Sequence, residues 1–393
     1  MKKNSEYNIV VLGVSCLDGM ASSMRVRNLL EPLIKKNLIK VNNIIYKNDA
    51  ADLKIYQGNI NKINYSIIGF NPRNILSIVQ FFYRGIIFID KNKCSSKKNI
   101  LYNYEYPDIK NILFLLYARL IGYKIVLDIV EDFRYYDRFA NSLNKLKIYS
   151  SLIFIKFAPF IAHSVLAISN HLYNLMLSIC KKKVSVYHIP ISVDVSIHQY
   201  KAYSPPNNYK IFYGGSFGEK DGIENLIKAF DQVCLKHHNV ELILTGRASD
   251  SDTKKLYCYL ERSSSKEKIN YKGFLSTEEY YQILGQCDIF CVPRVNSKFA
   301  NAGFPFKLGE FLSLGKAVIA TDVGDISKYL TNNKNAIIIK PDSIDALVNS
   351  ISHILQNPQI IDALGQEGRK VAERHFDTEI LSTKLFKIFT KLC

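Results

Sequence analysis

Short apolar runs alternate with segments of helical spacing along most of the chain, and this alternation constrains the fold more than any other feature. Runs that read as β-strands, each followed by an amphipathic segment, lie at 8–15 (NIVVLGVS), 164–169 (SVLAIS), 211–215 (IFYGG), 241–246 (ELILTG) and 317–322 (AVIATD). Two further runs are predicted as strands, at 65–70 (YSIIGF) and 85–90 (GIIFID). Parallel strands need a crossover connection, usually a helix. The pattern therefore predicts an α/β fold of parallel sheets wrapped by helices.

A polar, proline-bearing stretch at 201–210 (KAYSPPNNYK) interrupts the alternation, which then restarts. Such a stretch is typical of a linker between domains. We predict two doubly wound domains, residues 1–204 and 205–375. Residues 376–393 are expected to form a C-terminal helix that packs back towards the first domain.

Charge is distributed unevenly between the two halves. The 393 residues carry 52 Lys and Arg against 35 Asp and Glu, a net charge of +17. Residues 1–200 hold 27 basic and 13 acidic side chains, or +14, whereas the remainder hold 25 and 22, or +3. This asymmetry indicates a polyanionic neighbour: an anionic membrane, nucleic acid or an acidic substrate. Nucleic acid is disfavoured, because the basic residues are dispersed and no nucleic-acid-binding motif accompanies them.

An anionic membrane surface is the partner that we favour for the first domain. Basic clusters at 91–98 (KNKCSSKK) and 180–183 (CKKK) accompany the apolar, aromatic stretch 148–160 (IYSSLIFIKFAPF). Together they predict reversible, salt-sensitive docking on an anionic bilayer. A Lys-rich composition or an acidic soluble partner would produce the same charge.

The sequence indicates a cytoplasmic protein. Its eight cysteines contain no C-x-x-C pair and are predicted to be reduced thiols. The first apolar run is short and fits a strand better than a secretion leader. Residues 148–168 are long enough to span a bilayer, but Lys156, Pro159 and His163 interrupt them, which favours a helix followed by a buried strand. We expect a cytoplasmic chain, peripheral on the inner face of the plasma membrane.

Glycine and basic residues gather in the loops that follow the strands of the second domain. In an open parallel sheet these carboxyl-end loops meet at one edge, where ligands bind. They lie at 214–222, 245–250, 272–279, 292–307 and 321–325. Glycine lets a backbone approach a phosphate, and Lys220, Arg294 and Lys307 would add positive charge.

Lys307 lies in the first turn of a predicted helix, where a cation opposes the macrodipole. A bound diphosphate would explain this position. Glu310, one turn further on, would then bind two ribose hydroxyls. An isolated Lys-x-x-Glu pair is more often a solvated ion pair, so the surrounding loop carries this interpretation.

Five segments resemble a known family. They are 165–176 (VLAISNHLYNLM), 187–200 (YHIPISVDVSIHQY), 213–230 (YGGSFGEKDGIENLIKAF), 269–294 (INYKGFLSTEEYYQILGQCDIFCVPR) and 303–330 (GFPFKLGEFLSLGKAVIATDVGDISKYL). They resemble the retaining glycosyltransferases of the bacterial group-1 type, which have the GT-B architecture: two facing Rossmann-like domains with a cleft between them. The resemblance implies a hexosyltransferase-type enzyme that moves a sugar from a nucleotide-diphosphate sugar to a glycan or lipid-linked acceptor in cell-surface polysaccharide biosynthesis. It also implies retention and metal-independent transfer.

The resemblance implies roles for individual donor-site residues. Glu310 matches the family's ribose-binding Glu, whereas the family's preceding Glu falls on Ala302 and is missing here. Gly303 and Phe304 match the loop whose backbone meets the diphosphate or sugar. Phe274 matches the position beside the nucleobase.

Cations of the family site are only partly matched. Ser216 replaces the family's Arg, Lys220 stands two residues before Gly222 where the family's Lys is usually adjacent, and Arg294 would compensate. The expected nucleotide-sugar-binding residues are Gly215, Ser216, Lys220, Gly246, Phe274, Arg294, Gly303, Phe304, Lys307 and Glu310.

The first domain matches the family only loosely. Gly19 stands where the family has a glycine-rich loop, and Asp128, Glu131 and Asp132 follow a predicted strand. One of these acids would contact the acceptor or the transferred sugar, although capping of a helix start explains them equally well. The family often has a His there and this chain does not; His163 precedes a strand and is expected in the core or at its rim. Catalytic roles are expected for Glu131, Asp132 and Lys307.

No metal or further cofactor is expected beside the nucleotide-sugar co-substrate. The acidic run 249–252 (SDSD) falls at a helix start, and no zinc pattern or Ser-His-Asp arrangement is evident. A hydrolysing epimerase of the same fold is an alternative, but it would be expected to show more acids and His and less positive charge. A non-catalytic nucleotide-sugar-binding assembly subunit is another, kept open by Ala302. A dinucleotide oxidoreductase is disfavoured, because no G-x-G-x-x-G follows the first strand.

Overall fold

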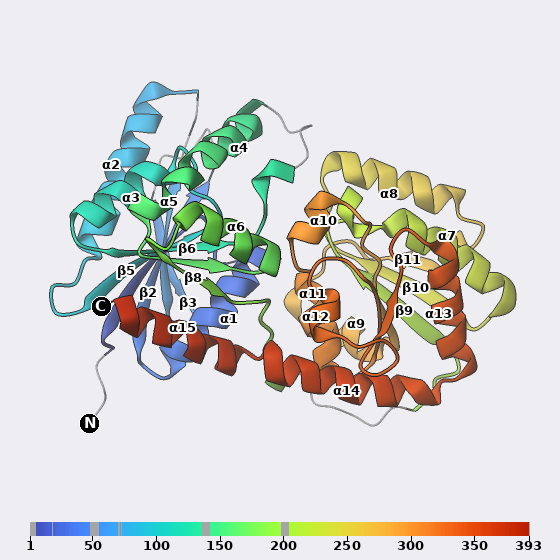
Figure 1. The fold of residues 1–393 in the computed structure, drawn as a ribbon. Coiled ribbons are helices and arrows are strands. Elements are labelled where there is room, and N and C mark those ends of the chain that lie inside the picture. Colours follow the sequence, from blue (N-terminus) through green and yellow to red (C-terminus); the bar gives the residue numbers. More distant parts are fainter. Residues whose placement is uncertain are drawn as a thin grey trace. The chain divides into compact units, whose positions relative to one another are not determined.

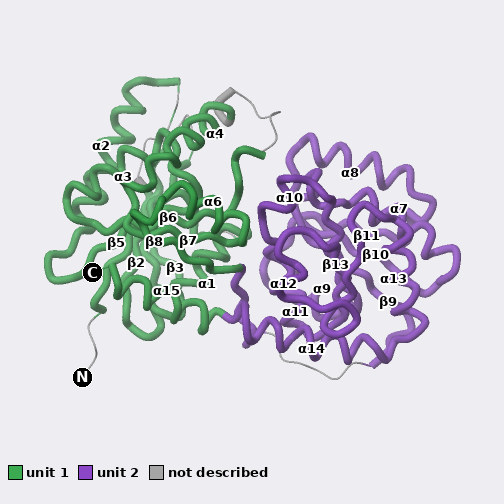
Figure 2. Tube along the Cα trace, in the orientation of Figure 1, with its two compact units in different colours: residues 1–190, 378–393 green, residues 191–377 purple. Residues whose placement is uncertain are grey.

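The computed structural model describes residues 5–17, 19–47, 55–69, 71, 73–135, 142–197 and 204–392. Unit 1 comprises Met1–Pro190 and Thr378–Cys393, and unit 2 comprises Ile191–Asp377 (Figure 2). The first boundary thus lies at 190/191, whereas the sequence indicated 204/205. The reason is local: Ile191 and Val193 lie beside Gly309, and the Val193 N–H donates to the Phe376 carbonyl at 2.9 Å.

Unit 1 is built on an eight-stranded sheet in the order β3-β4-β2-β1-β5-β6-β7-β8 (Figure 1). Its strands are β1 (Tyr7–Leu12), β2 (Ile39–Lys47), β3 (Ile55–Ile60), β4 (Ile63–Gly69), β5 (Lys98–Tyr104), β6 (Lys124–Ile129), β7 (Ser164–Ala167) and β8 (Ser185–His188). All pairs are parallel except β3 with β4, an antiparallel hairpin at the edge. The fully apolar stretch 9–12 of β1 is buried, as expected for a strand covered on both faces.

The helices of unit 1 are α1 (Ala21–Lys35), α2 (Ile75–Lys91), α3 (Asn111–Leu120), α4 (Ser142–Phe154), α5 (Ala158–Ile161), α6 (Asn170–Cys180) and α15 (Thr378–Leu392). The last of these, α15, packs against α1, and the Phe386 ring meets the Tyr7 ring edge-on with centroids 5.3 Å apart. The predicted strand at 85–90 is wrong, because this run forms the second half of α2. Asn74 caps that helix by accepting the Ser77 N–H, and a short apolar run alone does not distinguish a strand from a helix segment.

Unit 2 has a six-stranded, all-parallel sheet in the order β11-β10-β9-β12-β13-β14. Its strands are β9 (Tyr209–Gly214), β10 (Val240–Thr245), β11 (Ile269–Tyr271), β12 (Ile289–Val292), β13 (Ala317–Thr321) and β14 (Ile337–Ile339). Its helices are α7 (Ile223–Lys236), α8 (Asp250–Arg262), α9 (Thr277–Gln286), α10 (Lys298–Ala302), α11 (Phe306–Ser313), α12 (Ile326–Tyr329), α13 (Ile344–Gln356) and α14 (Gln359–His375).

Successive residues of β9 pack on opposite faces of the unit 2 sheet. Ile211 lies in the hydrophobic cluster formed with α7 and α13, whereas Phe212 packs against Phe290 and Phe311, with ring centroids 5.6 and 5.7 Å apart. Alternation along a strand sends neighbouring side chains to opposite faces, so helices cover both sides of the sheet.

Each unit has a sheet of parallel strands covered by helices, with β3 as the antiparallel exception, and this confirms the predicted α/β fold. The described cysteines carry free thiols, and Cys393 and residues 201–203 of the expected linker lie outside the described residues. Across the described part of the chain, we find no helix with both the length and the apolar character needed to cross a membrane.

Candidate functional site

The loops after β9, β10 and β11 are held together at one edge of the unit 2 sheet. The Gly246 N–H donates to the Gly273 carbonyl at 2.8 Å. Gly246 has a φ of +138°, and a Cβ there would lie 1.8 Å from the Gly215 carbonyl oxygen, so only glycine fits. Ser216, which follows, is exposed and donates to Asp221 Oδ2 at 2.7 Å. These residues shape a loop cluster at the carboxyl ends of the strands, where such sheets bind ligands.

The loops after β9 and β12 meet in a similar way. The Val295 N–H donates to the Lys220 carbonyl at 3.2 Å. Gly222 has a φ of +66°, and a Cβ there would lie 2.0 Å from the Pro293 carbonyl oxygen. The Lys220 ammonium lies over the Phe299 ring, 4.3 Å from its centroid. The β9 loop and its lysine are thereby fixed beside the segment that leads into α10 and α11.

Lys307 and Glu310 of α11 form a cluster with Tyr280 of α9. Lys307 Nζ lies 3.2 Å from Glu310 Oε2 and 4.2 Å from the centroid of the Tyr280 ring. The Tyr280 hydroxyl donates to the same Oε2 at 3.1 Å, and burial together with Glu310 raises the pKa of Tyr280 well above its usual value. Only 6% of the Glu310 side chain is exposed, so this is no solvated surface pair. Among the described residues, the contacts of the Glu310 carboxylate with Lys307 and Tyr280 are both made by Oε2.

Arg294 lies inside the β12 loop. The side chain is buried, its NH1 donates to the Ala300 carbonyl at 3.1 Å, and its own carbonyl accepts from Thr321 Oγ1 at 2.7 Å. Arg294 therefore secures the loop from within. Ala302, at the position of the missing family Glu, is fully buried, and Gly303 follows it as the C-cap of α10.

Two aromatic residues at this edge have different surroundings. Phe274 is exposed and stacks on Arg247, whose guanidinium carbon lies 4.6 Å from the ring centroid. This stack offers a flat surface on which a base ring can lie. Phe304 is buried against Tyr329, with ring centroids 5.4 Å apart, so its backbone and not its ring can face a ligand.

In unit 1, Asp128 lies buried in the core, where it is paired with Arg25. Its two carboxylate oxygens each accept a hydrogen bond of 2.8 Å from the Arg25 guanidinium, and the Tyr102 hydroxyl donates to Oδ2. Arg25 also donates to the carbonyls of Ile189 and Pro190 at 3.0 and 2.7 Å. The side chains of Arg25, Asp128 and Tyr102 are buried, so Asp128 is a structural ion pair that ties α1 to the end of β8.

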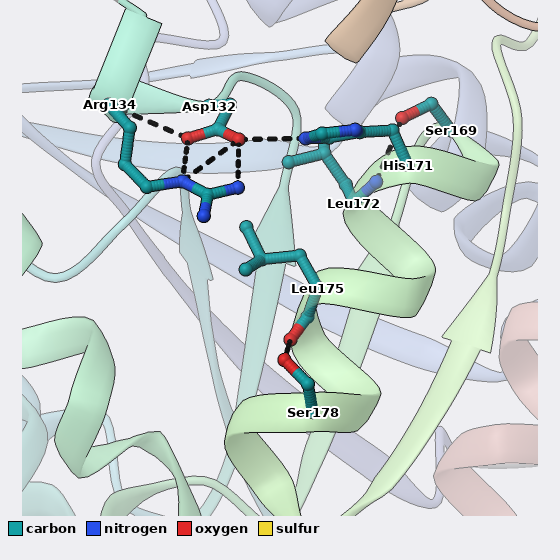
Figure 3. Close-up of polar contacts among 7 residues, drawn as sticks. All are labelled: Asp132, Arg134, Ser169, His171, Leu172, Leu175 and Ser178. Atoms are coloured by element: carbon teal, nitrogen blue, oxygen red, sulfur yellow. Dashed lines mark hydrogen bonds and ion pairs between the residues drawn. The ribbon is translucent and has the colours of Figure 1, made fainter.

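Asp132 holds a histidine in place (Figure 3). His171 Nε2 lies 2.8 Å from Asp132 Oδ2, and the Arg134 guanidinium binds both oxygens at 2.9 and 2.7 Å. Ser169 caps α6 by accepting the Leu172 N–H at 3.2 Å, which puts His171 in the first turn of that helix. Asp132 is fully buried, whereas 36% of the His171 side chain is exposed.

The charge state of Asp132 determines the role of each His171 nitrogen. Burial raises the pKa of Asp132, but hydrogen bonds from Arg134 and His171 outweigh burial and the pKa lies below its usual value. An ionised carboxylate only accepts hydrogen bonds. His171 Nε2 therefore carries a proton, and in the neutral imidazole Nδ1 is the nitrogen that can accept a hydrogen bond.

The remaining candidates of unit 1 are Gly19, Glu131 and His163. Gly19 is exposed in the loop before α1, and Glu131 is half-buried next to Asp132. His163 Nδ1 accepts the Ile125 N–H at 3.0 Å, and burial with nearby cations lowers the pKa of His163 to about 4. It is a structural residue at the start of β7.

Sequence reasoning missed His171, Tyr280 and Arg247. A signal for His171 existed: it follows the helix-capping Ser169 directly after a predicted strand, so it lies at the same sheet edge as the acids that follow β6. Tyr280 gives no local signal, because it is 30 residues from Glu310 in the sequence. For the residues that the structure describes, no group of three or more His, Cys, Asp and Glu side chains is arranged to hold a metal.

Two doubly wound parallel sheets with candidate residues at the carboxyl ends of the strands define the GT-B class of fold. Solved structures of sucrose-phosphate synthase from Thermosynechococcus elongatus (TM-score 0.77, 16% identity, 98% of this chain and 99% of that chain) have this fold. So does Anabaena HepE in complex with UDP-glucose (TM-score 0.72, 15% identity, 98% and 99% covered). At these identities the likeness establishes the fold.

The family described as Glycosyl transferases group 1 matches residues 197–371, which make up most of unit 2. The capsular polysaccharide biosynthesis glycosyltransferase CapM of Staphylococcus aureus is 22% identical over 183 residues, covering 47% of this chain and 46% of CapM. The MMP alpha-(1->4)-mannosyltransferase of Mycolicibacterium hassiacum is 22% identical over 205 residues, covering 52% and 47%. The chain spans about half the length of these curated relatives. The sequence similarity of this chain to group 1 glycosyltransferases thus lies mainly in unit 2, and its likeness to the solved structures over the whole chain is one of fold.

Proposed function

We propose that the chain is a glycosyltransferase that moves a sugar from a nucleotide-diphosphate sugar to a glycan or lipid-linked acceptor in cell-surface polysaccharide biosynthesis. Transfer proceeds with retention of the anomeric configuration and without a metal ion. The name of CapM supports the polysaccharide context, and the UDP-glucose bound to HepE makes UDP sugars the first donors to test. The reaction takes place on the cytoplasmic side of the membrane.

The cluster of Lys307, Glu310 and Tyr280 carries this proposal. Glu310 Oε2 is engaged by the other two members, so Oε1 accepts the ribose hydroxyls of the nucleotide. Lys307, held at 3.2 Å by Glu310, meets the diphosphate together with the free N–H groups at the start of α11. As the sugar–oxygen bond breaks, negative charge grows on the leaving phosphate, and Lys307 and Lys220 stabilise it. Phe274 and Arg247 receive the base.

Unit 1 supplies the acceptor side. Asp132 is buried and its oxygens are occupied, so it acts as a positioning residue. His171 Nδ1 accepts a hydrogen bond from the acceptor hydroxyl and orients it. Glu131, half-buried beside Asp132, contacts the acceptor sugar.

Calorimetry with nucleoside diphosphates tests the donor side. We expect UDP to bind the wild-type chain, and Glu310→Gln to weaken the Kd about tenfold, because the ribose loses a charged acceptor. Glu261→Gln on α8 is the matched control, since it removes an exposed carboxylate paired with Lys266. If no nucleoside diphosphate binds the wild type, the donor assignment is rejected; equal affinities of wild type and Glu310→Gln would make Glu310 structural.

Turnover assays separate transfer from the alternatives. Transfer releases the nucleoside diphosphate only when an acceptor is present, a hydrolysing epimerase releases it without one, and a binding subunit releases none. Retention is read from the anomeric configuration of the product by NMR. Turnover that is unchanged after chelation by EDTA is the result expected for a metal-independent enzyme.

A further inference from the structure

Unit 1 carries an exposed apolar surface on neighbouring helices. The structure describes 21 large apolar side chains that are exposed, and 13 of them lie on α2, on or just before α3, and along the α4–α5 segment. Only four of these 21 exposed side chains belong to unit 2. We call these 13 residues, which form three stripes, the apolar face. A concentration of this kind marks an interaction surface.

The first stripe runs along α2. Ile75, Leu76, Val79 and Tyr83 are exposed, and their spacing of one, three and four residues keeps them on one side of the helix. Phe81, on the other side, is buried in the core of unit 1. The helix therefore carries apolar residues on its solvent side as well as on its core side.

The second stripe runs along α3. Ile109, Leu113, Leu116 and Leu120 are spaced by four, three and four residues, and Leu120 is 83% exposed. Phe114, on the opposite side, is fully buried. The solvent side of this helix is a ladder of aliphatic residues.

The third stripe continues from α4 into α5. Leu146, Tyr149, Ile153, Phe157 and Phe160 are spaced by three, four, four and three residues, and each is at least half exposed. The short 3₁₀ turn Ile155–Phe157 joins the two helices, so the stripe is not interrupted.

The helices that carry these stripes are neighbours in unit 1 (Figure 1). α2 packs against α3, and α3 packs against α5. The Ile109 N–H donates to Ser150 Oγ of α4 at 3.2 Å, and Arg119 NH1 at the end of α3 donates to the Ile161 carbonyl of α5 at 3.0 Å. The three stripes of the apolar face thus lie on helices that contact one another.

Positive charge accompanies the apolar face. The elements that form it contain one acidic residue, Asp90, and six basic residues: Arg84, Lys91, Arg119, Lys145, Lys147 and Lys156. Lys183 Nζ lies 4.7 Å from the centroid of the Phe160 ring, which brings the basic run 181–183 to the edge of the face.

We propose that the apolar face docks unit 1 on an anionic lipid bilayer. The apolar stripes enter the interfacial region, and the lysines meet headgroup phosphates; this arrangement corresponds to helices that lie on a membrane. Charge selects the bilayer over a second copy of the chain, because two faces with the same positive charge repel each other. The proposal rests on the proposed function in one respect: a lipid-linked acceptor would lie in the same membrane. The sequence indicated 148–160 and its flanking basic runs; the structure adds α2 and α3.

Co-sedimentation with vesicles tests this proposal on the full chain. We expect binding to phosphatidylcholine vesicles that contain phosphatidylglycerol and little binding to phosphatidylcholine alone. High salt should reduce the bound fraction about tenfold, because screening shortens the reach of the lysines.

Two matched pairs of variants identify the surface. Tyr149→Ser, Ile153→Ser and Phe157→Ser combined should lower the partition coefficient about tenfold or more, whereas the unit 2 control Leu235→Ser with Tyr257→Ser should not. Lys156→Gln with Lys183→Gln should weaken binding to anionic vesicles, and its control is Lys254→Gln with Lys255→Gln on α8. Circular dichroism checks that each variant is folded.

The outcomes are distinct. The proposal is overturned if the full chain does not bind anionic vesicles at low salt. It is also overturned if the variant with Tyr149→Ser, Ile153→Ser and Phe157→Ser binds them as well as the wild type. Dimerisation that the triple variant abolishes, without vesicle binding, would assign the face to a second copy and also overturn it. Vesicle binding needs no nucleotide, so a chain that binds vesicles but no nucleoside diphosphate would overturn the proposed function and leave this proposal standing.

Discussion

Replacing Asp132 by Asn tests whether this carboxylate acts through His171. In the wild type, Oδ2 accepts from His171 Nε2 at 2.8 Å while Arg134 binds both oxygens. An Asn side chain would keep its oxygen for Arg134 and turn its NH2 group toward His171. Nε2 would then have to accept, and the imidazole proton would move to Nδ1. The exposed nitrogen of His171 would change from acceptor to donor.

Two free-energy changes follow from this geometry. Loss of the acceptor that orients the hydroxyl should lower kcat/KM roughly a hundredfold, or about 2.7 kcal/mol. The stability change is smaller, because 44% of the Arg134 side chain is exposed and solvent screens its ion pair with Asp132. We expect the free energy of unfolding to fall by about 1–2 kcal/mol. The variant should therefore remain folded while it loses most of its turnover.

The assay measures initial rates against acceptor concentration at saturating donor, and nitrogen NMR shifts of the imidazole report the tautomer. Asp108→Asn is the matched control. Asp108 is a buried carboxylate of unit 1 that accepts the backbone N–H groups of Lys110 and Asn111, so its replacement removes a buried charge without touching a histidine. Its turnover should stay close to wild type.

His171→Asn and the double variant with Asp132→Asn complete the experiment. If Asp132 works through the imidazole, the double variant is no slower than the slower single variant. Wild-type turnover in Asp132→Asn, an unchanged tautomer, or rate losses that multiply in the double variant would refute the reasoning.

Three other predictions concern the donor loops and the rim of unit 1. Lys307→Ala should reduce turnover about a hundredfold, or roughly 3 kcal/mol, with an unchanged circular dichroism spectrum; near-normal kinetics would remove Lys307 from the catalytic residues. Gly246→Ala should lower the free energy of unfolding in urea by about 2–4 kcal/mol, because its φ is +138° and the new Cβ would meet a carbonyl oxygen. Gly285→Ala has open space and should not destabilise; equal effects would contradict the clash. The pKa of His163 is lowered from 6.5 to about 4 by burial and nearby cations, so below pH 6.5 the unfolded state takes up a proton that the folded state resists. Stability should fall as the pH drops from 6.5 towards 4, and His163→Gln should flatten that part of the Tm–pH curve; an unchanged slope would argue against this role.

Much of the fold was predictable from the sequence because parallel strands covered on both faces are short, apolar and separated by helices. The interpretation failed at residues 85–90, where the apolar run belongs to α2. That helix carries apolar residues on its solvent side as well, so the usual polar face that distinguishes a helix from a strand is absent.

The candidate site was predictable only where its contacts are local. Lys307 and Glu310 are three residues apart on one helix, and their proximity follows from helical geometry. Tyr280 reaches Glu310 from another helix, and His171 reaches Asp132 from a neighbouring strand–helix unit 39 residues away. Such pairs depend on strand order and on exact packing, neither of which a single sequence reveals. The burial of Arg294 was not predictable for the same reason. A basic residue in a loop is expected to be exposed unless its hydrogen-bond partner, here the Ala300 carbonyl, is known.

The place of α15 has a consequence for how the chain is made. This helix covers α1 with Leu381, Leu385 and Phe389, yet it follows the whole of unit 2 in the sequence. During synthesis, unit 1 emerges first but lacks its last helix until residues 191–377 have been translated, which takes about 10–40 s at ordinary rates. Unit 2, which is continuous in sequence, can finish folding first. Until then the α1 surface of the nascent first unit stays uncovered, and exposed apolar surface of this kind is prone to aggregation and is where chaperones act.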